Sequence, residues 1–319
     1  MPEAFYPYPI IAGPTASGKT DLAVRLAMEL GGEVVSADSM QIYAEVSVGT
    51  ARPTTEEMQG VPHHLLGFLP LQEKYSVARY LEDAEAVFSA IFARGAQPVM
   101  CGGTGLYIQS FMENRQLFDQ QPDPALRREL VALAETRGNE VLVERLQQVD
   151  PESAARLHMN DRNRLIRALE VFYTTGRTIG EQDRLSHSRP SRYSACLFVL
   201  DFHDRQRLYD RINQRVERML TCGLLEEARR VLETDPDATV TQAIGYKEFA
   251  RYFSGEISLE EAAERLKQQT RRYAKRQLSW FHRMPAAHTL WVDDAVNGED
   301  LVREAACIYD QFCHREETK

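Results

Sequence analysis

The sequence of 319 residues predicts an α/β fold, in which a parallel sheet flanked by helices is interrupted by an all-helical insertion. Three observations predict it. An apolar run leads into a glycine-rich segment near the N-terminus. Further short apolar runs alternate with segments of helical spacing, which is typical of a parallel sheet covered on both faces. In the middle of the chain the strand-like runs stop, and only helical spacing remains.

The first third of the chain supplies three strands and two helices. Residues 8–14 (YPIIAGP) form a short apolar run that predicts the first strand. Residues 20–30 (TDLAVRLAMEL) have helical spacing, and the glycines at 31–32 end that helix. The next elements are a second strand, a helix and a third strand, expected at 33–39, 77–95 and 98–105.

The middle of the chain is helical and lies between two polar breaks, at 118–124 and 185–194. Its helical segments span 124–138, 140–150, 151–158 and 161–176. A strand at 195–202, long helices and a late strand at 288–294 follow the second break. We therefore predict a core domain formed by 1–118 and 194–319, with a helical insertion domain at 119–193.

Composition narrows the class of protein. No apolar run reaches the roughly 20 residues of a membrane span, and the N-terminus lacks the pattern of a secretion signal, so we expect a cytoplasmic protein without a membrane partner. The five cysteines are scattered and predict reduced thiols. Nothing in the sequence indicates an obligate partner chain, so we expect a monomer. The net charge is −9, yet 265–292 holds seven Lys and Arg residues and no acid, which indicates a local basic stripe.

The segment GPTASGKT fits the phosphate-loop pattern G-x-x-x-x-G-K-[ST], with a strand before it and a helix after it. Its backbone N–H groups and the helix N-terminus point at phosphate oxygens. We expect Lys19 to neutralise the terminal phosphates and the Thr20 hydroxyl to bind Mg²⁺. The predicted phosphate-binding residues are Gly13, Pro14, Thr15, Ala16, Ser17, Gly18, Lys19 and Thr20. The sheet is therefore predicted to be P-loop NTPase-like.

The loop alone does not define a reaction, because ATP, GTP and other diphosphates all suit it. No predicted strand shows four apolar residues and an acid in the place usual for the second nucleotide motif. A guanine-reading N-K-x-D is also missing. Small-molecule kinases remain, as do transferases that use the loop for a different diphosphate.

Polar residues follow the second and third strands. Asp38 comes where the second strand leaves the sheet, at the edge where ligands bind in such folds. Its carboxylate either accepts a proton from an attacking hydroxyl or amine, or caps the next turn. Gln41 carries the amide that reads an adenine edge, and Ser39 is either a cap or a hydrogen-bonding group. Thr104 likewise caps the following helix or holds the reacting group.

Many separate motifs then indicate a family. They are GPTASGKT, SADSMQIY, VGTARP, PHHLL, GGTGLY, RLIRALEV, RINQRVERML, QAIGYKEF and KRQLSWF, in this order. With them the chain resembles the bacterial tRNA dimethylallyltransferases, also called tRNA isopentenyltransferases, of the isopentenylpyrophosphate transferase family. The resemblance extends from about Ile10 to Asp294. It departs at Gly67, where the family often has Asp, so no role is assigned there.

The resemblance implies an activity. Such enzymes move a dimethylallyl group from dimethylallyl diphosphate to N6 of the adenosine on the 3′ side of the tRNA anticodon, position 37. The bond broken is then C–O rather than P–O. The resemblance implies that Asp38 takes the proton from N6, that Thr104 holds the amine and that Arg215 lies near the diphosphate. Arg211 lies one turn before it on the same helix face.

The resemblance also implies contacts with the tRNA anticodon stem-loop. The adenine of this loop has to leave its stack to reach the site. We expect tRNA contacts from the second strand end, the insertion domain, QAIGYKEF and the basic stripe. These residues are Ser39, Met40, Gln41, Arg162, Asn163, Arg164, Leu165, Ile166, Gln242, Ala243, Ile244, Gly245, Tyr246, Lys247, Lys275 and Arg276. The alternatives are an ATP-dependent kinase of a small metabolite and an RNA-binding protein with a relic loop.

Overall fold

A computed structural model describes the chain over residues 6–117, 123–186, 191–234 and 239–317. The predicted breaks at 118–124 and 185–194 lie partly outside these residues, as does the domain boundary after residue 118. The chain divides into two compact units. The first is Met1–Met112 with Ser191–Lys319, and the second is Glu113–Pro190.

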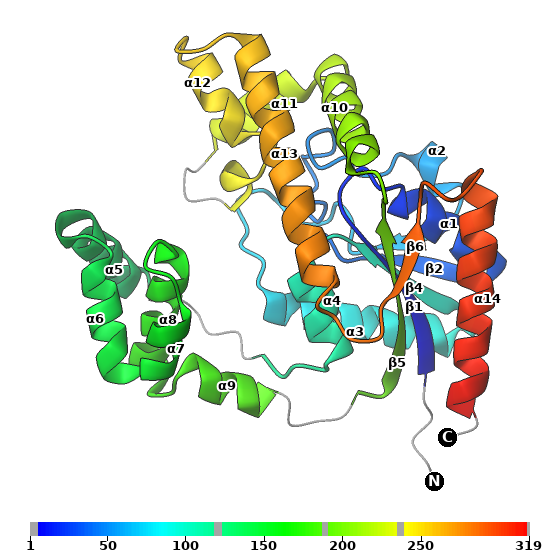
Figure 1. Cartoon of the computed structure of the whole chain (residues 1–319), viewed down its shortest axis with the longest axis horizontal. Helices are drawn as coiled ribbons and strands as arrows, with labels where there is room; N and C mark the ends of the chain where they lie inside the picture. The colour runs from blue at the N-terminus through cyan, green and yellow to red at the C-terminus, as the bar shows by residue number, and fades with distance from the viewer. Residues whose placement is uncertain (1–5, 118–122, 187–190, 235–238, 318–319) are drawn as a thin grey trace. The chain divides into compact units, whose positions relative to one another are not determined.

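The first unit contains one sheet of six parallel strands in the order β3-β2-β4-β1-β5-β6 (Figure 1). Its strands are β1 Tyr6–Ala12, β2 Gly32–Ser36, β3 His63–His64, β4 Gln97–Gly102, β5 Tyr193–Asp201 and β6 His288–Trp291. The sheet confirms the predicted α/β fold. Because β1 is central, Ile10, Ile11 and Ala12 have no exposed surface.

Helices α3 (Val77–Ala93) and α4 (Gly105–Met112) cover one face of this sheet, together with the end of α13 (Leu259–Phe281). Helix α3 starts where the Ser76 side chain accepts a hydrogen bond from the Arg79 backbone N–H. The apolar cluster on this face includes Tyr8, Phe88, Ile108 and Phe281. Residue 281, late in the chain, therefore packs against strands from its beginning.

Helices α1 (Lys19–Glu29) and α14 (Gly298–Glu317) contact each other and cover the opposite face (Figure 1). Their buried side chains share an apolar cluster with strand residues, including Leu22, Leu26, Leu290 and Leu301. The two layers fix the start of α1, and with it the phosphate loop, against the middle of the sheet.

A third apolar cluster joins the C-terminal helices to the chain that follows β2. It includes Ile42, Leu69, Val216, Leu224 and Phe249. The elements around it are α2 Thr55–Met58, α10 Arg205–Thr221, α11 Leu224–Leu232, η1 Thr239–Gln242, η2 Lys247–Phe249 and α12 Ala250–Phe253. This packing brings α10 and residues 47–59 to the same side of the phosphate loop, where both line one cleft.

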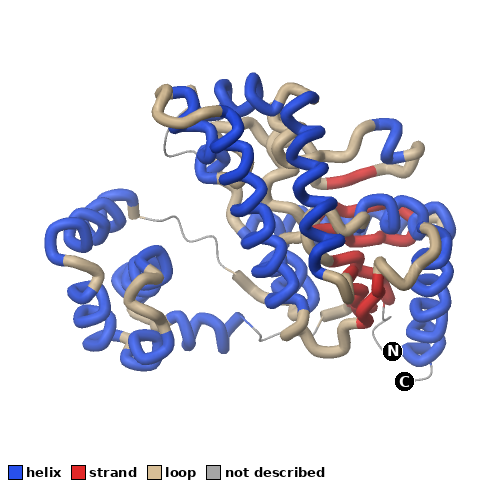
Figure 2. Tube along the Cα trace, turned by 45° about the horizontal axis from the view of Figure 1, so that its top comes forward, coloured by secondary structure: helices blue, strands red, loops and turns tan. Residues whose placement is uncertain are grey.

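The second unit is helical in the residues described, as Figure 2 shows by its colours. Its helices are α5 Pro124–Arg137, α6 Glu140–Val149, α7 Pro151–Arg156, α8 Arg162–Thr175 and α9 Ile179–Ser186. Leu130, Leu142, Leu165 and Leu169 are fully buried in its core. Among the described residues of the whole chain, no helix is long and apolar enough to cross a membrane.

Candidate active site

The phosphate loop connects the end of β1, at Ala12, to the start of α1, at Lys19. Gly18 has a φ of 95°, in the left-handed region that favours glycine. At Gly13 the φ is 151°, and a Cβ would lie 3.1 Å from the Leu200 carbonyl oxygen of the neighbouring strand. Glycine is therefore required at both ends of the loop, as its pattern predicts.

Two cationic side chains, from Lys19 and Arg211, form hydrogen bonds to carbonyl oxygens of the loop. The Lys19 Nζ donates a hydrogen bond to the Pro14 carbonyl oxygen at 3.3 Å. The Arg211 Nε donates to the Ala16 carbonyl oxygen at 2.8 Å, and Ala16 has a φ of 63°. These two bonds fix loop carbonyl groups, and two loop N–H groups are also used within the protein, since Thr15 donates to the Gln277 side chain and Ser17 to the Pro14 carbonyl oxygen. The helix N-terminus at Lys19 remains directed at an anion.

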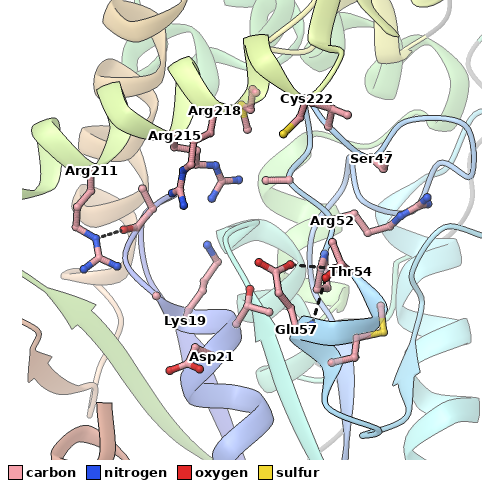
Figure 3. Close-up of a pocket in the computed structure, with 18 of the residues that line it drawn as sticks. Lys19, Asp21, Ser47, Arg52, Thr54, Glu57, Arg211, Arg215, Arg218 and Cys222 are labelled. Atoms are coloured by element: carbon pink, nitrogen blue, oxygen red, sulfur yellow. Dashed lines mark hydrogen bonds between the residues drawn. The ribbon is translucent and has the colours of Figure 1, made fainter. Parts of the chain in front are cut away.

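The loop opens into a cleft of about 1130 Å³ (Figure 3). Its walls come from the loop and α1, from residues 47–59 and from α10. Figure 3 shows Lys19, Arg215 and Arg218 extending toward one common space. The charged lining residues are Lys19, Asp21, Arg52, Glu57, Arg211, Arg215 and Arg218. Cations thus outnumber carboxylates, which suits a ligand with several negative charges.

None of these five cations has a carboxylate within ion-pair distance among the described residues. Burial lowers the pKa of Lys19, and it lowers the pKa of Arg215 to about 10. The nearby Asp38 charge opposes this effect on both groups. Arg215 therefore stays cationic at neutral pH. Partly desolvated cations such as Lys19 and Arg215, which have no carboxylate partner, are what an anionic ligand would stabilise.

Asp38 and Thr104 follow the neighbouring strands β2 and β4, and both form hydrogen bonds to the backbone of residues 37–41. The Asp38 Oδ1 accepts hydrogen bonds from the backbone N–H groups of Met40, at 2.9 Å, and Gln41, at 3.3 Å. The Thr104 Oγ1 accepts from the Ser39 backbone N–H at 3.0 Å. In the described residues, the Asp38 Oδ2 accepts no hydrogen bond. The bonds to Oδ1 fix the carboxylate and leave one oxygen available to a substrate proton.

Of the residues predicted to bind diphosphate, Ala16, Gly18, Lys19, Thr20 and Arg215 line this cleft, whereas Asp38 and Thr104 lie at neighbouring strand ends and are not among its lining residues. The structure adds two cations that the sequence analysis missed, Arg52 and Arg218. Arg218 follows Arg211 and Arg215 at helical spacing in RINQRVERML, so this spacing could have predicted that Arg218 lies on the same face of the helix. Arg52 lies in VGTARP, one of the motifs that the chain shares with the family, and this position could have identified it as a candidate site residue.

Strand β5 also runs from apolar residues, Cys196 to Leu200, into an acid, Asp201, although it is not the predicted third strand, β4, where the second nucleotide motif is expected. The structure gives Asp201 another role, since its carboxylate is fully buried and pairs with Arg205 and with His282, at 2.7 Å from Nε2. A carboxylate neutralised in this way is not available to a metal ion.

Several residues predicted to contact tRNA are buried within their own units. Leu165 and Ile166 have no exposed surface and lie in the core of the second unit. Tyr246 also has none, since its hydroxyl donates to Glu227 and its ring packs against Gly49. These three side chains therefore have no exposed surface with which to make the predicted contact with tRNA in this structure. Gly245, next to Tyr246, is buried as well.

Gln41 already uses its side-chain amide inside the protein. Its Nε2 donates to the carbonyl oxygens of Thr50 and Ala51, both at 3.2 Å. Ser39, Met40, Arg162, Ala243 and Ile244 are half-buried. The predicted RNA contacts that are exposed are Asn163, Arg164, Gln242, Lys247, Lys275 and Arg276. Lys275 and Arg276 lie on α13, and Asn163 and Arg164 begin α8 of the second unit.

A phosphate loop on a parallel sheet, facing unpaired cations and a carboxylate at the next strand end, defines a P-loop enzyme that acts on a phosphorylated substrate. Comparison with known proteins narrows this class. A family model described as IPP transferase matches residues 41–284, and one described as isopentenyl transferase matches 8–73. The chain belongs to the IPP transferase family.

Curated relatives agree with this assignment. The tRNA dimethylallyltransferase of Thermoanaerobacter sp. (strain X514) is 46% identical over 92% of this chain and 94% of its own. The enzyme of the same name from Geobacillus thermodenitrificans is 48% identical over 89% of each chain.

Solved structures give the same result. The full-length tRNA isopentenylpyrophosphate transferase of Bacillus halodurans is 38% identical, with a TM-score of 0.73 over 98% of both chains. A eukaryotic dimethylallyltransferase described as acting on tRNA has a TM-score of 0.75 at 29% identity, over 90% of this chain and 74% of its own. The prediction of the family from sequence motifs is confirmed, and the kinase alternative is not favoured.

Proposed function

We propose that the protein transfers a dimethylallyl group from dimethylallyl diphosphate to N6 of the adenosine at position 37, on the 3′ side of the tRNA anticodon. The observation that carries the proposal is the position of Asp38. Asp38 and Thr104 follow β2 and β4, whose carboxyl ends lie at the same edge of the parallel sheet as the end of β1, where the phosphate loop begins. A leaving diphosphate and a proton acceptor are thus available at one centre.

The cleft would bind the leaving group. As the allylic C–O bond breaks, the electron pair stays with the diphosphate oxygen and negative charge grows there. Lys19, Arg215 and the N-terminus of α1 stabilise this charge. Because they are partly desolvated and fixed before the substrate arrives, they act more strongly than the same groups in water.

Asp38 and Thr104 would act on the amine. The N6 nitrogen forms the new bond to the allylic carbon, and one of its protons passes to the free Oδ2 of Asp38. The backbone N–H groups on Oδ1 keep the carboxylate oriented during this transfer. The Thr104 Oγ1, which accepts from the Ser39 backbone N–H and donates to the Ser39 Oγ at 3.3 Å, would accept a hydrogen bond from the adenine amine. N6-isopentenyladenosine and diphosphate are the products.

The residues present also fit Mg²⁺. The Thr20 hydroxyl lines the cleft next to Lys19, and Mg²⁺ prefers oxygen ligands with phosphate oxygens completing its shell. Thr20 would hold the ion. When bound, Mg²⁺ would neutralise part of the charge on the diphosphate.

The exposed cations would bind the anticodon stem-loop through its phosphates. Lys275 and Arg276 are exposed on α13, and Arg164 and Lys247 are exposed elsewhere on their units. One chain supplies the cleft, Asp38 and Thr104, which supports action as a monomer. Since tRNA is the substrate, we expect the enzyme to act in the cytoplasm.

The test uses purified protein, Mg²⁺, dimethylallyl diphosphate and an anticodon stem-loop with adenosine at position 37. We expect the RNA to gain the mass of one C₅H₈ unit without ATP, and a matched stem-loop with guanosine at that position to gain nothing. If the RNA is unchanged while ATP phosphorylates a small metabolite, the proposal fails and the kinase alternative stands.

A further inference from the structure

Gln277 of α13 joins the phosphate loop to the turn that carries Thr104. Its Oε1 accepts a hydrogen bond from the Thr15 backbone N–H of the loop at 3.0 Å. Its Nε2 donates to the Gly103 carbonyl oxygen, next to Thr104, at 2.9 Å. One side chain thus binds both halves of the site, although it lies 262 residues from Thr15 and 174 from Gly103.

The surroundings of Gln277 suit an amide side chain better than a carboxylate or an apolar side chain. Gln277 is only 6% exposed, and its neighbours on the inner face of α13 are the buried apolar residues Ala274, Leu278 and Phe281. The site offers one donor, the Thr15 N–H, and two acceptors, the Gly103 carbonyl oxygen and the Tyr273 hydroxyl. An amide, with two N–H donors and an acceptor oxygen, satisfies all three, whereas an ionised carboxylate offers only acceptors. A Cβ on Gly103 would lie 2.2 Å from the Gln277 Nε2, so the backbone approaches the amide as closely as glycine allows.

A role in packing alone would not need this chemistry. A leucine of similar volume would suit the apolar neighbours and avoid the cost of burying an amide. The buried amide makes sense where two backbone segments have to keep a fixed separation. Here those segments carry the groups proposed to bind the diphosphate and the adenine amine.

We propose that Gln277 is a positioning residue that sets the distance between the bound diphosphate and the amine held at Thr104. This inference rests on the proposed prenyl transfer. The attacking nitrogen and the allylic carbon must meet in line, and a misplacement of about 1 Å costs on the order of 10²-fold in rate. Gln277 touches neither substrate and acts through Thr15 and Gly103.

Two variants separate its two hydrogen bonds to the backbone. In Gln277→Glu, the ionised carboxylate still accepts from Thr15 but repels the Gly103 carbonyl oxygen. We expect kcat to fall by about 30- to 100-fold while the Kd for dimethylallyl diphosphate changes by less than about 3-fold. In Gln277→Leu both bonds are lost, so kcat falls and donor binding weakens as well. Gln268→Glu, on an exposed position of the same helix, is the matched control and keeps wild-type kinetics.

The pH profile provides a readout that a packing role would not change. A protonated carboxyl has one O–H donor and one acceptor, so it restores both bonds in Gln277→Glu. The kcat of this variant, divided by that of the wild type at each pH, should rise as the pH falls. The same ratio for Gln277→Leu should stay flat. Hydrogen exchange at the Thr15 amide should speed up only in Gln277→Leu.

The outcomes distinguish this inference from the function on which it rests. If the wild type modifies the stem-loop and both Gln277 variants stay within about 2-fold of its kcat, the inference alone is wrong. It is also wrong if the pH ratios of the two variants are the same. If the wild type does not modify RNA, the proposed function fails. The exchange rate at Thr15 then still reports whether Gln277 holds the loop, including when a variant is unstable.

Discussion

The carboxylate of Glu227 accepts a hydrogen bond from the buried hydroxyl of Tyr246 at 2.9 Å. The same carboxylate accepts from three successive backbone N–H groups, those of residues 47–49, at 2.7 to 3.0 Å. Ser47, Val48 and Arg52 line the substrate cleft. Glu227 lies on α11 and does not itself line the cleft. Its hydrogen bonds nevertheless fix the cleft wall opposite the phosphate loop.

Replacing Glu227 with Gln should destabilise the protein and loosen this wall. The amide loses one acceptor oxygen and turns an N–H₂ group toward backbone donors, so buried N–H groups lose their partners. We expect the free energy of unfolding to fall by about 2–3 kcal/mol, with a higher KM for the prenyl donor. Denaturant unfolding and donor kinetics measure the two effects. The control is Glu226→Gln, an exposed neighbour, and equal stability of the two variants would contradict the role of Glu227.

Replacing Asp38 with Asn should remove the proton acceptor while keeping most of its hydrogen bonds. The amide oxygen still accepts from the Met40 and Gln41 backbone N–H groups. We expect kcat for prenyl transfer to fall by about 10²- to 10⁴-fold. The Kd for the stem-loop should stay within about 2-fold, because no charge–phosphate contact is removed. Single-turnover transfer and RNA binding are the measurements. A kcat within a few-fold of the wild type would mean that another group takes the proton.

Replacing Arg215 with Gln should weaken stabilisation of the leaving diphosphate. The guanidinium is partly buried beside Asp38 and pairs with no carboxylate among the described residues, so its charge is free for a ligand. We expect kcat/KM for the donor to fall by about 10²- to 10³-fold. Arg207→Gln is the matched control, because Arg207 is exposed two turns earlier on the same helix and does not line the cleft. Similar losses in both variants would show that the effect belongs to the charge of α10 as a whole.

The sequence predicts the features that are local in the chain. The phosphate loop is eight consecutive residues, so its glycines and Lys19 could be found without knowing the fold. The alternation of apolar and helical segments likewise predicts the parallel sheet. The edge strand His63–His64 has only two residues, too few to show a period, and so it was missed.

Interactions between distant residues could not be predicted in this way. Tyr246 has the residue type of an RNA-stacking side chain, and only tertiary packing shows that its partner is Glu227. The same holds for Gln277, whose partners lie in two other motifs. Asp201 shows the reverse case, because its local sequence resembles a nucleotide motif while its buried ion pairs with Arg205 and His282 give it a structural role. Burial and partner choice belong to the folded chain and leave no local pattern.

Glu33 should make stability depend on acid pH. Its carboxylate accepts hydrogen bonds from Arg94, and His64 Nε2 lies 2.6 Å from it. The Arg94 guanidinium, aided by His64 and opposed by burial, lowers the pKa of Glu33 from 4.5 to about 2. A lowered carboxyl pKa adds stability that is complete above about 4.5 and is lost as the pH falls toward 2.

The variant Glu33→Gln should therefore be less stable than the wild type at neutral pH by about 1 kcal/mol, because the exposed Arg94 is screened by solvent, and the gap should close on acidification below pH 4.5. Denaturant unfolding at a series of pH values measures it. Glu73→Gln serves as the control, since Glu73 pairs with Arg79 on the surface. A gap that stays constant from pH 7 to pH 3 would contradict the ion pair.

Lys275 and Arg276 should contribute to the salt dependence of RNA binding. Both are exposed on α13, in a stretch from residue 265 to 292 without Asp or Glu. Each cation that neutralises a phosphate adds about 0.7–0.9 to the slope of log Kd against log salt concentration. Replacing both with Gln should therefore lower the slope by about 1.5, without changing kcat at saturating RNA. The control removes two exposed charges elsewhere, Lys74→Gln with Arg303→Gln, and should keep the wild-type slope. An unchanged slope in the α13 variant would mean that RNA binds to a different surface.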